Sequence, residues 1–139
     1  MLIDIFTRMI RGWKLSQYLN TSLTLKPLEE ALHRSVPEIH HSDQGVQYLS
    51  NAYISTLRYH DIEISVARRE CPWENGYAER LIRTLKEEEV HLNDYKDVIE
   101  ARGHIGHFIT QVYHQKRSHL ALGYLTPIEF KGRYLSSLC

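Results

Sequence analysis

Two acidic residues, Asp43 and Glu79, have the type and the setting of metal ligands. Asp43 directly follows Ile39–Ser42, which is predicted to form a short β-strand, and Glu79 lies on the polar side of a predicted amphipathic helix. Magnesium prefers oxygen ligands and is commonly held by one or two carboxylates together with water and substrate phosphate. The pair is weak evidence alone, because a turn-capping Asp43 and a solvated Glu79 would give the same pattern.

The elements that would position these acids alternate between strands and helices, which predicts a mixed α/β fold. Hydrophobic periodicity, turn residues and helix caps define them. The chain begins with two antiparallel strands, Leu2–Phe6 and Met9–Leu15, which are joined at Thr7-Arg8, and continues with a helix that is capped by Thr24, has Pro27 in its first turn and ends before Pro37. The middle of the chain has a strand at Ile39–Ser42, a helix that is capped by Ser50 and reaches about His60, a strand at Ile62–Val66 and a loop at Ala67–Trp73. The last predicted elements are a helix from Glu74, a helix over about Tyr95–Gln115 and a possible short helix after Pro127.

Composition narrows the class of protein but not its function. The 139 residues suit one domain, and 42% hydrophobic with 24% charged residues is ordinary for a globular chain. Seventeen basic residues balance seventeen acidic ones, so net charge does not decide whether the chain binds nucleic acid. The sequence has neither a basic leader nor an apolar run of membrane-spanning length, and we expect a cytoplasmic protein. Cys71 and Cys139 are expected to be free thiols.

Three segments resemble those of DDE-type insertion-sequence transposases related to retroviral integrases. His40–Tyr48 is similar to the family block that holds the second catalytic aspartate, here Asp43. Cys71–Lys86 is similar to the block that holds the catalytic glutamate, here Glu79, including a basic residue seven positions later. Tyr113–Pro127 resembles the carboxyl-terminal signature, and the 35 residues between the two acids match the family spacing. The resemblance covers nearly the whole chain.

This resemblance implies a ribonuclease-H-like mixed sheet flanked by helices, with residues of about 1–92 in that part and about 93–139 in a carboxyl-terminal helix and tail. In the family, three acids hold two Mg²⁺ or Mn²⁺ ions that support cleavage and strand transfer of DNA. Asp43 and Glu79 are then metal ligands and catalytic residues. The implied partners are DNA, as insertion-element ends and target duplex, and further copies of the chain in a homo-oligomer. Such a protein is associated with the nucleoid when bound to DNA.

The first catalytic aspartate of the family is expected to lie outside this sequence. Leu2–Phe6 resembles the second strand of the fold, whereas the aspartate belongs to the first strand, which the family order places between the second and the fourth. Asp4 matches a second-strand position outside the triad and does not replace it. Smaller departures from the family pattern occur at Glu70, His114 and Ser118. We therefore predict an incomplete active site that is inactive alone, and translation of the DNA upstream of the start codon would test for a separately encoded strand.

Five basic residues are candidates for contact with DNA. Lys86 lies two helical turns beyond Glu79 on the same predicted face, and Arg83 is a second candidate there. Lys116, Arg117 and His119 belong to the carboxyl-terminal signature, where basic and aromatic residues are interleaved. The competing interpretations are salt bridges along the helix for Lys86 and Arg83 and packing of the tail for the others.

Three other interpretations of the sequence stay open. His40-His41, or His104 with His107, offer imidazole groups for zinc but lack the third ligand of a usual site. A nuclease with only two carboxylates would need a replacement ligand, for which His41 and Asp61 are the first candidates. A remnant without catalysis would keep only DNA binding or oligomer contacts.

Overall fold

A computed structural model describes residues 1–139, apart from the side chain of Pro72. The chain forms two compact units. The first contains Met1–Leu2 and Arg11–Leu81, and the second contains Ile3–Ile10 and Ile82–Cys139. Both candidate metal ligands lie in the first unit.

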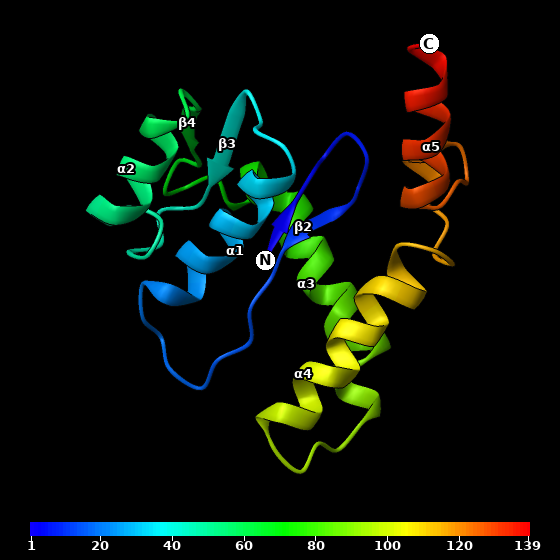
Figure 1. Cartoon of the computed structure of the whole chain (residues 1–139). Coiled ribbons are helices and arrows are strands. Elements are labelled where there is room, and N and C mark those ends of the chain that lie inside the picture. Colours follow the sequence, from blue (N-terminus) through cyan, green and yellow to red (C-terminus); the bar gives the residue numbers. More distant parts are fainter. The chain divides into compact units, whose positions relative to one another are not determined.

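A parallel strand pair forms the centre of the first unit (Figure 1). β3 (Ile39–Ser42) pairs with β4 (Glu63–Val66) so that Ser42 lies opposite Val66. The helices α1 (Ser22–Arg34) and α2 (Asn51–Tyr59) pack against this pair through a shared apolar cluster. Its buried members are Leu28, Leu32, Tyr53, Leu57 and Ile62.

The predicted elements around Asp43 are confirmed. β3 has the predicted bounds, and Asp43 follows it directly. Ser50 caps α2, because its hydroxyl accepts a hydrogen bond of 3.3 Å from the Tyr53 amide. The buried residues of β3 are the polar His40 and Ser42, whereas Ile39 is exposed, so the turn that follows the strand is the stronger local signal.

The first two strands are shorter than predicted. β1 (Leu2–Ile3) and β2 (Ile10–Gly12) pair in a two-stranded sheet, and the residues between them form a loop. The Asp4 carboxylate accepts hydrogen bonds from the amides of Phe6 (3.0 Å) and Thr7 (3.2 Å), which turns the backbone away from extended structure. Arg8 adopts a left-handed conformation at φ 60°. Asp4 thus shapes this loop, as local side-chain hydrogen bonding favours.

The predicted cap of α1 is wrong. The helix begins three residues earlier than the Thr24 cap requires, with Thr21 at the N-cap, and the Thr24 hydroxyl donates to the Thr21 carbonyl at 3.1 Å instead. Pro27 consequently lies inside the helix rather than in its first turn. A Cβ at Gly12 would stand only 2.1 Å from the Pro27 carbonyl oxygen, so β2 approaches α1 more closely than any residue but glycine permits.

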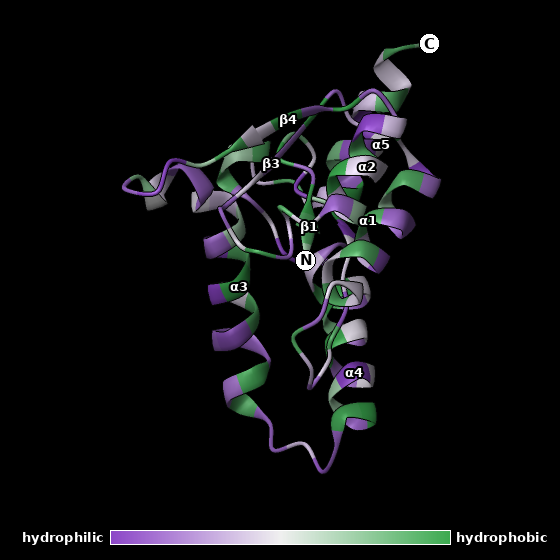
Figure 2. Cartoon of the chain, turned by 90° about the vertical axis from the view of Figure 1, so that its left-hand side faces the viewer, coloured by the Kyte–Doolittle hydropathy of each residue, from purple (hydrophilic) through white to green (hydrophobic). Residues whose placement is uncertain are grey.

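In contrast to α1, the helix that carries Glu79 begins later than predicted. A 3-10 turn, Pro72–Asn75, precedes α3 (Gly76–Glu88), so Glu74 lies in the turn and not in the helix. Polar and apolar residues alternate along α3 in the way an amphipathic helix requires (Figure 2). Leu81 and Leu85 of its predicted apolar face are buried, while Ile82 is exposed.

The second unit is mainly helical. α4 (Val98–His107) follows the cap residue Asp97, begins three residues later than the predicted start, and continues as a π-helical turn at Phe108–Tyr113. His114, which departs from the family pattern, is buried and accepts a hydrogen bond of 3.0 Å from the Ile10 amide through Nε2. Short 3-10 turns occur at Val90–Leu92 and Leu120–Leu122, and the last helix is α5 (Pro127–Ser137).

α5 is longer than the short helix allowed by the sequence because it has a complete capping box. The Thr126 hydroxyl accepts from the Glu129 amide at 3.3 Å, and the Glu129 carboxylate accepts from the Thr126 amide at 2.9 Å. We expect Thr126→Ala to destabilise the second unit by about 1 kcal/mol, since the first-turn amides lose an acceptor. The free energy of unfolding of Thr126→Ser, which keeps the hydroxyl, should stay within a few tenths of a kcal/mol of the parent value. Urea unfolding followed by circular dichroism measures both, and equal stability of the two variants would contradict the role of the hydroxyl.

The strands form two separate sheets within the described residues, β1 with β2 and β3 with β4. None of the helices that the structure describes is both long and apolar enough to cross a membrane.

Candidate active site

Asp43 lies at the carboxyl end of β3, where the chain leaves the sheet. Its side chain is exposed, and one carboxylate oxygen accepts a hydrogen bond of 2.8 Å from the Gly45 amide. The bond holds the side chain in an Asx-type turn and leaves the second oxygen for other contacts. Asp43 therefore combines a fixed position with access to solvent, as an ion ligand needs.

A small cavity of about 40 Å³ lies beside Asp43. A single buried water needs roughly 10 to 15 Å³, so the cavity holds more than one water-sized group. It is bounded by the start of β1, by β3 and by the beginning of α3. Its lining residues are Met1, Leu2, His40, His41, Ser42, Asp43, Tyr48, Asn75 and Ala78.

Glu79 lies in the first turn of α3, directly after the cavity-lining Ala78. Its side chain is exposed, and Glu79 is not one of the described residues that line the cavity. The structure thus brings Asp43 to the beginning of the helix that carries Glu79, within one unit. It does not enclose the two carboxylates in a common pocket.

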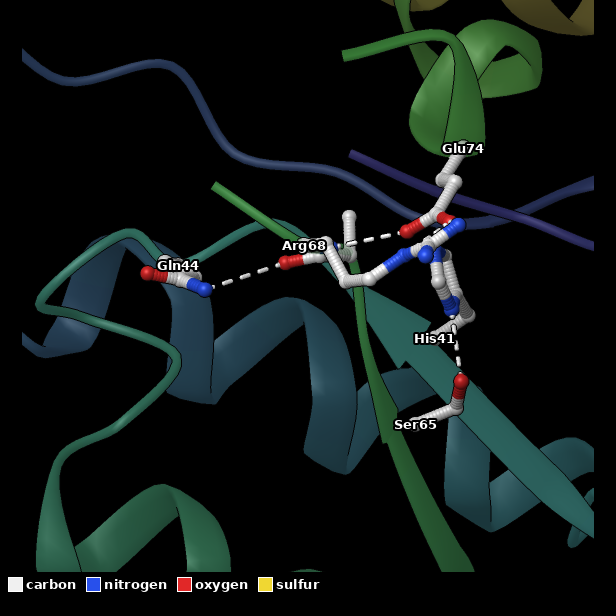
Figure 3. Close-up of polar contacts among 6 residues, drawn as sticks. His41, Gln44, Ser65, Arg68 and Glu74 are labelled. Carbon is white, nitrogen blue, oxygen red and sulfur yellow. Dashed lines mark hydrogen bonds and ion pairs between the residues drawn. The ribbon is translucent and has the colours of Figure 1, made fainter. Parts of the chain in front are cut away.

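The loop between β4 and α3 is held in place by contacts that the sequence did not reveal (Figure 3). The Glu74 carboxylate accepts hydrogen bonds from the Arg68 amide at 2.8 Å and from the Arg68 guanidinium at 2.9 and 2.7 Å. Gln44, next to Asp43, donates to the Ala67 carbonyl at 3.2 Å. The only sign of these contacts in the sequence is that Arg68 and Glu74, which carry opposite charges, lie near the two ends of the predicted loop. These bonds tie the end of β4 to the turn that begins α3.

Two of these groups have shifted pKa values. Hydrogen bonds from the Arg68 side chain and backbone lower the pKa of the Glu74 carboxyl, and the same pairing raises the pKa of Arg68. Both groups stay charged near neutral pH. Because Arg68 is 76% exposed, we assign the pair a positional role rather than a large contribution to stability.

A buried histidine supports the strand that leads to Asp43. His40 is 7% exposed, and its Nε2 lies 2.8 Å from the hydroxyl of the fully buried Tyr53. Among the described residues, His40 Nδ1 has no hydrogen-bond partner. Burial lowers the pKa of His40, and the neighbouring His41 lowers it further. His40 is therefore neutral in the folded protein near pH 7.

This histidine makes stability depend on pH. Its folded pKa lies below the unfolded value of about 6.5, so the unfolded state binds the proton first and stability falls as pH drops below that value. Burial also lowers the pKa of His119, which acts in the same direction. Between about pH 7.5 and about pH 5.5 we expect His40 to contribute a loss of at most about 1.4 kcal/mol, and the partly exposed His119 to contribute less. Urea unfolding at the two pH values measures it, and His40→Gln should reduce the slope. A slope unchanged in that variant would contradict the assignment.

The other metal-ligand candidates occupy different places. The described residues contain no group of three or more His, Cys, Asp or Glu side chains arranged to hold a metal ion. His41 lines the cavity with Asp43, but its Nδ1 also lies 2.8 Å from the Ser65 hydroxyl. Asp61 precedes the amino end of β4, so parallel pairing places it at the opposite end of the strands from Asp43. His104 lies 3.6 Å from the Glu89 carboxylate. Of the two replacement candidates, only His41 is beside Asp43.

Cysteine side chains can also bind metal ions. Cys71 and Cys139 are free thiols, as expected.

The five basic candidates lie in the second unit. Arg83 and Lys86 are exposed on α3, and Lys116 is exposed after the π-helical turn. The Arg117 guanidinium forms an ion pair with Glu88. His119 packs edge-on against a tyrosine at a ring distance of 5.3 Å, and burial followed by nearby arginines lowers its pKa. At neutral pH His119 is therefore uncharged, and its buried Nε2 has no hydrogen-bond partner among the described residues.

Comparison with known proteins identifies relatives along nearly the entire chain. Residues 1–72, slightly more than half of it, match the family described as "Integrase core domain", and residues 60–127 match a second family of the same description. The transposase for insertion sequence element IS904 of Lactococcus lactis subsp. lactis is 34% identical over 132 residues, covering 93% of this chain and 52% of that protein. The transposase InsF for insertion sequence IS3A of Escherichia coli strain K12 is 29% identical over 138 residues, covering 97% of this chain and 48% of that protein. The chain spans about half the length of the curated relatives it matches.

The matched regions contain the elements that carry both acids. β3 lies within residues 1–72, and α3 lies within residues 60–127. The order of the two matches follows the chain, and the relatives align across both. The chain belongs to the integrase core domain family of insertion-sequence transposases.

Proposed function

We propose that this chain is part of the catalytic core of a transposase that cuts DNA at insertion-element ends and joins those ends to target DNA. The carrying observation is the position of Asp43 at the end of β3, on a cavity also bordered by the first turn of α3, the helix with Glu79. Family membership implies a ribonuclease-H-like fold, and the mixed α/β structure is consistent with it. The two transposases named above support the same reaction class.

Asp43 and Glu79 fit Mg²⁺ or Mn²⁺ by the chemistry of their donor atoms. Both are exposed carboxylates, and two carboxylates with water and phosphate oxygens suffice for one such ion. When bound, the metal supplies activation of the attacking oxygen and stabilisation of the leaving oxygen in phosphoryl transfer. Asp43 would place a negative charge at the end of β3, and Glu79 would place one at the beginning of α3. The Gly45 amide keeps the Asp43 carboxylate in place.

We further propose that the first strand of the family, with its aspartate, fits between β1 and β3. The two sheets are separate, and one cavity is lined by Leu2 from β1 and by His40–Ser42 from β3. An inserted strand would join the sheets through the free edges of both strands. It would also bring a third carboxylate close to Asp43. Residues 1–139 alone carry two of the three acids, so we expect them to be inactive alone.

Basic residues on the second unit are proposed to bind DNA phosphates. Arg83, Lys86 and Lys116 are exposed and are the main candidates, whereas Arg117 would have to exchange its ion pair with Glu88 for a phosphate and His119 is uncharged near neutral pH. Such contacts position DNA without reading its sequence. Recognition of two insertion-element ends also favours a homo-oligomer of the full-length protein.

A remnant that only binds DNA or contacts other copies is the second candidate. It is favoured by the absence of a three-ligand metal group among the described residues. A two-carboxylate nuclease would need His41 as its third ligand, which requires the imidazole to leave Ser65.

Duplex binding tests the proposal. We expect residues 1–139 to bind duplex DNA at low salt, and affinity to fall steeply with salt because phosphate contacts release counterions. Lys86→Ala should reduce the salt slope by about 1, as expected for one lost phosphate contact. Retained binding without cleavage is compatible with both candidates, whereas no binding at low salt would contradict both. Mg²⁺-dependent nicking by these residues alone, lost in Glu79→Gln, would overturn the expected inactivity.

A further inference from the structure

An exposed tryptophan precedes the helix that carries Glu79. Trp73 lies in the 3-10 turn before α3 and is 71% exposed. The other tryptophan, Trp13, is half-buried. Exposure leaves most of the indole without packing contacts, although a large aromatic ring stabilises a fold mainly by burial. A role in binding explains the position of Trp73 better than a role in the core.

The turn holds Trp73 in a defined position. The Glu74 amide donates to the Cys71 carbonyl at 3.0 Å, and the Cys71 amide donates to the Arg68 carbonyl at 3.0 Å. The Glu74 carboxylate binds the Arg68 backbone and guanidinium, which closes the loop (Figure 3). Trp73 is thus flanked by a residue whose side chain is fixed at three points. A ring presented in this way loses little conformational entropy on binding.

The surroundings of the turn suit a nucleic acid. Asn75, two residues after Trp73, lines the cavity beside Asp43. Arg69 in the same loop and Arg80 in the first turns of α3 are exposed. An aromatic ring among cationic side chains is the combination that binds single-stranded nucleic acid, through base stacking and phosphate contact. Bases inside a duplex are already stacked on each other, so the ring can accept only an unpaired base.

We propose that Trp73 stacks on an unpaired nucleobase at the DNA end that enters the candidate site, and so positions that end beside Asp43. This inference rests on the proposed function. It makes Trp73 a positioning residue, because it touches the DNA away from the reacting phosphate. The Arg68–Glu74 pair holds the turn that presents the indole.

The test uses tryptophan fluorescence in residues 1–139. Trp13→Phe leaves Trp73 as the only tryptophan, so its emission reports stacking directly. We expect strong quenching by a single-stranded oligonucleotide and by a duplex with a frayed end, and little quenching by a closed hairpin duplex. Trp73→Ala should weaken binding of the single strand by about 5- to 150-fold, whereas Trp73→Tyr should retain most of the affinity. The matched control is Tyr59→Ala, which removes another exposed aromatic ring from the same unit and should change nothing.

Each remaining outcome decides the question. Unchanged single-strand affinity in Trp73→Ala, with duplex binding intact, would overturn the stacking role and leave the proposed function standing. Loss of all DNA binding by the parent chain would overturn both. A blue shift of Trp73 emission that grows with protein concentration, in the absence of DNA, would assign the indole to self-association instead. Circular dichroism of each variant separates these outcomes from unfolding.

Discussion

Glu79→Gln is expected to lower DNA cleavage and joining by at least about 1000-fold in a protein whose active site is complete, and Asp43→Asn is expected to do the same. A metal ion contributes several kcal/mol to phosphoryl transfer, and about 4 kcal/mol corresponds to about 1000-fold in rate. Glutamine keeps the size of Glu79 but removes the negative charge that the proposed role as a metal ligand requires. A site with all three proposed acids would be built by fusing residues 1–139 behind the part of the Lactococcus lactis relative that precedes its matched region, which is 34% identical to this chain.

A second measurement keeps the prediction testable if the fusion does not fold. Calorimetric titration of residues 1–139 with Mn²⁺ should show weak binding that both substitutions remove. Glu87→Gln is the matched control, because Glu87 is also an exposed acid on α3. Ion binding that persists in both Asp43→Asn and Glu79→Gln would contradict their assignment as ligands, as would full activity of either variant in the fusion.

The strand before Asp43 could be predicted because turn residues and a helix cap bound it. Ile39–Ser42 is followed by the turn residues Gln44 and Gly45, and Ser50 provides a helix cap shortly after. Turn residues and helix caps act on residues that are close along the chain, so they can be recognised in the sequence without knowledge of the fold. The expectation that Asp43 is a metal ligand came from the resemblance to transposases, because the spacing of the acids alone did not support it.

The beginnings of α1 and α3 could not be predicted from the same signals. Thr24 has a side chain suited to a cap, but the helix extends back to Thr21, where no side-chain cap bond forms. Glu74 has high helix propensity, yet its carboxylate is engaged by Arg68, six residues earlier. At α3 a contact specific to the fold overrides a residue preference, and at α1 the preferred cap residue lies inside the helix. The position of Trp73 follows from the contact at α3, so it too was absent from the sequence-based prediction.

Tyr53→Ala is expected to destabilise the first unit by about 3 to 5 kcal/mol, the usual cost of removing a large buried aromatic side chain. Tyr53 is fully buried, packs edge-on against Tyr48 and His40 at ring distances of 5.4 Å, and bonds to His40 through its hydroxyl. Tyr59→Ala is the control, since Tyr59 is on the same helix and 85% exposed. Its stability should stay within about 0.5 kcal/mol of the parent.

The same residue connects the core to the candidate site. His40 and Tyr48 lie on either side of Asp43 in sequence, and both line the cavity. Tyr53→Phe removes only the hydroxyl, leaves the His40 nitrogen without its partner, and should cost about 1 to 3 kcal/mol. If Tyr53 supports the end of β3, Tyr53→Ala should also weaken Mn²⁺ binding at temperatures where it remains folded, while Tyr59→Ala should not. Equal urea midpoints for Tyr53→Ala and Tyr59→Ala would show that the core described around β3 does not hold the strand.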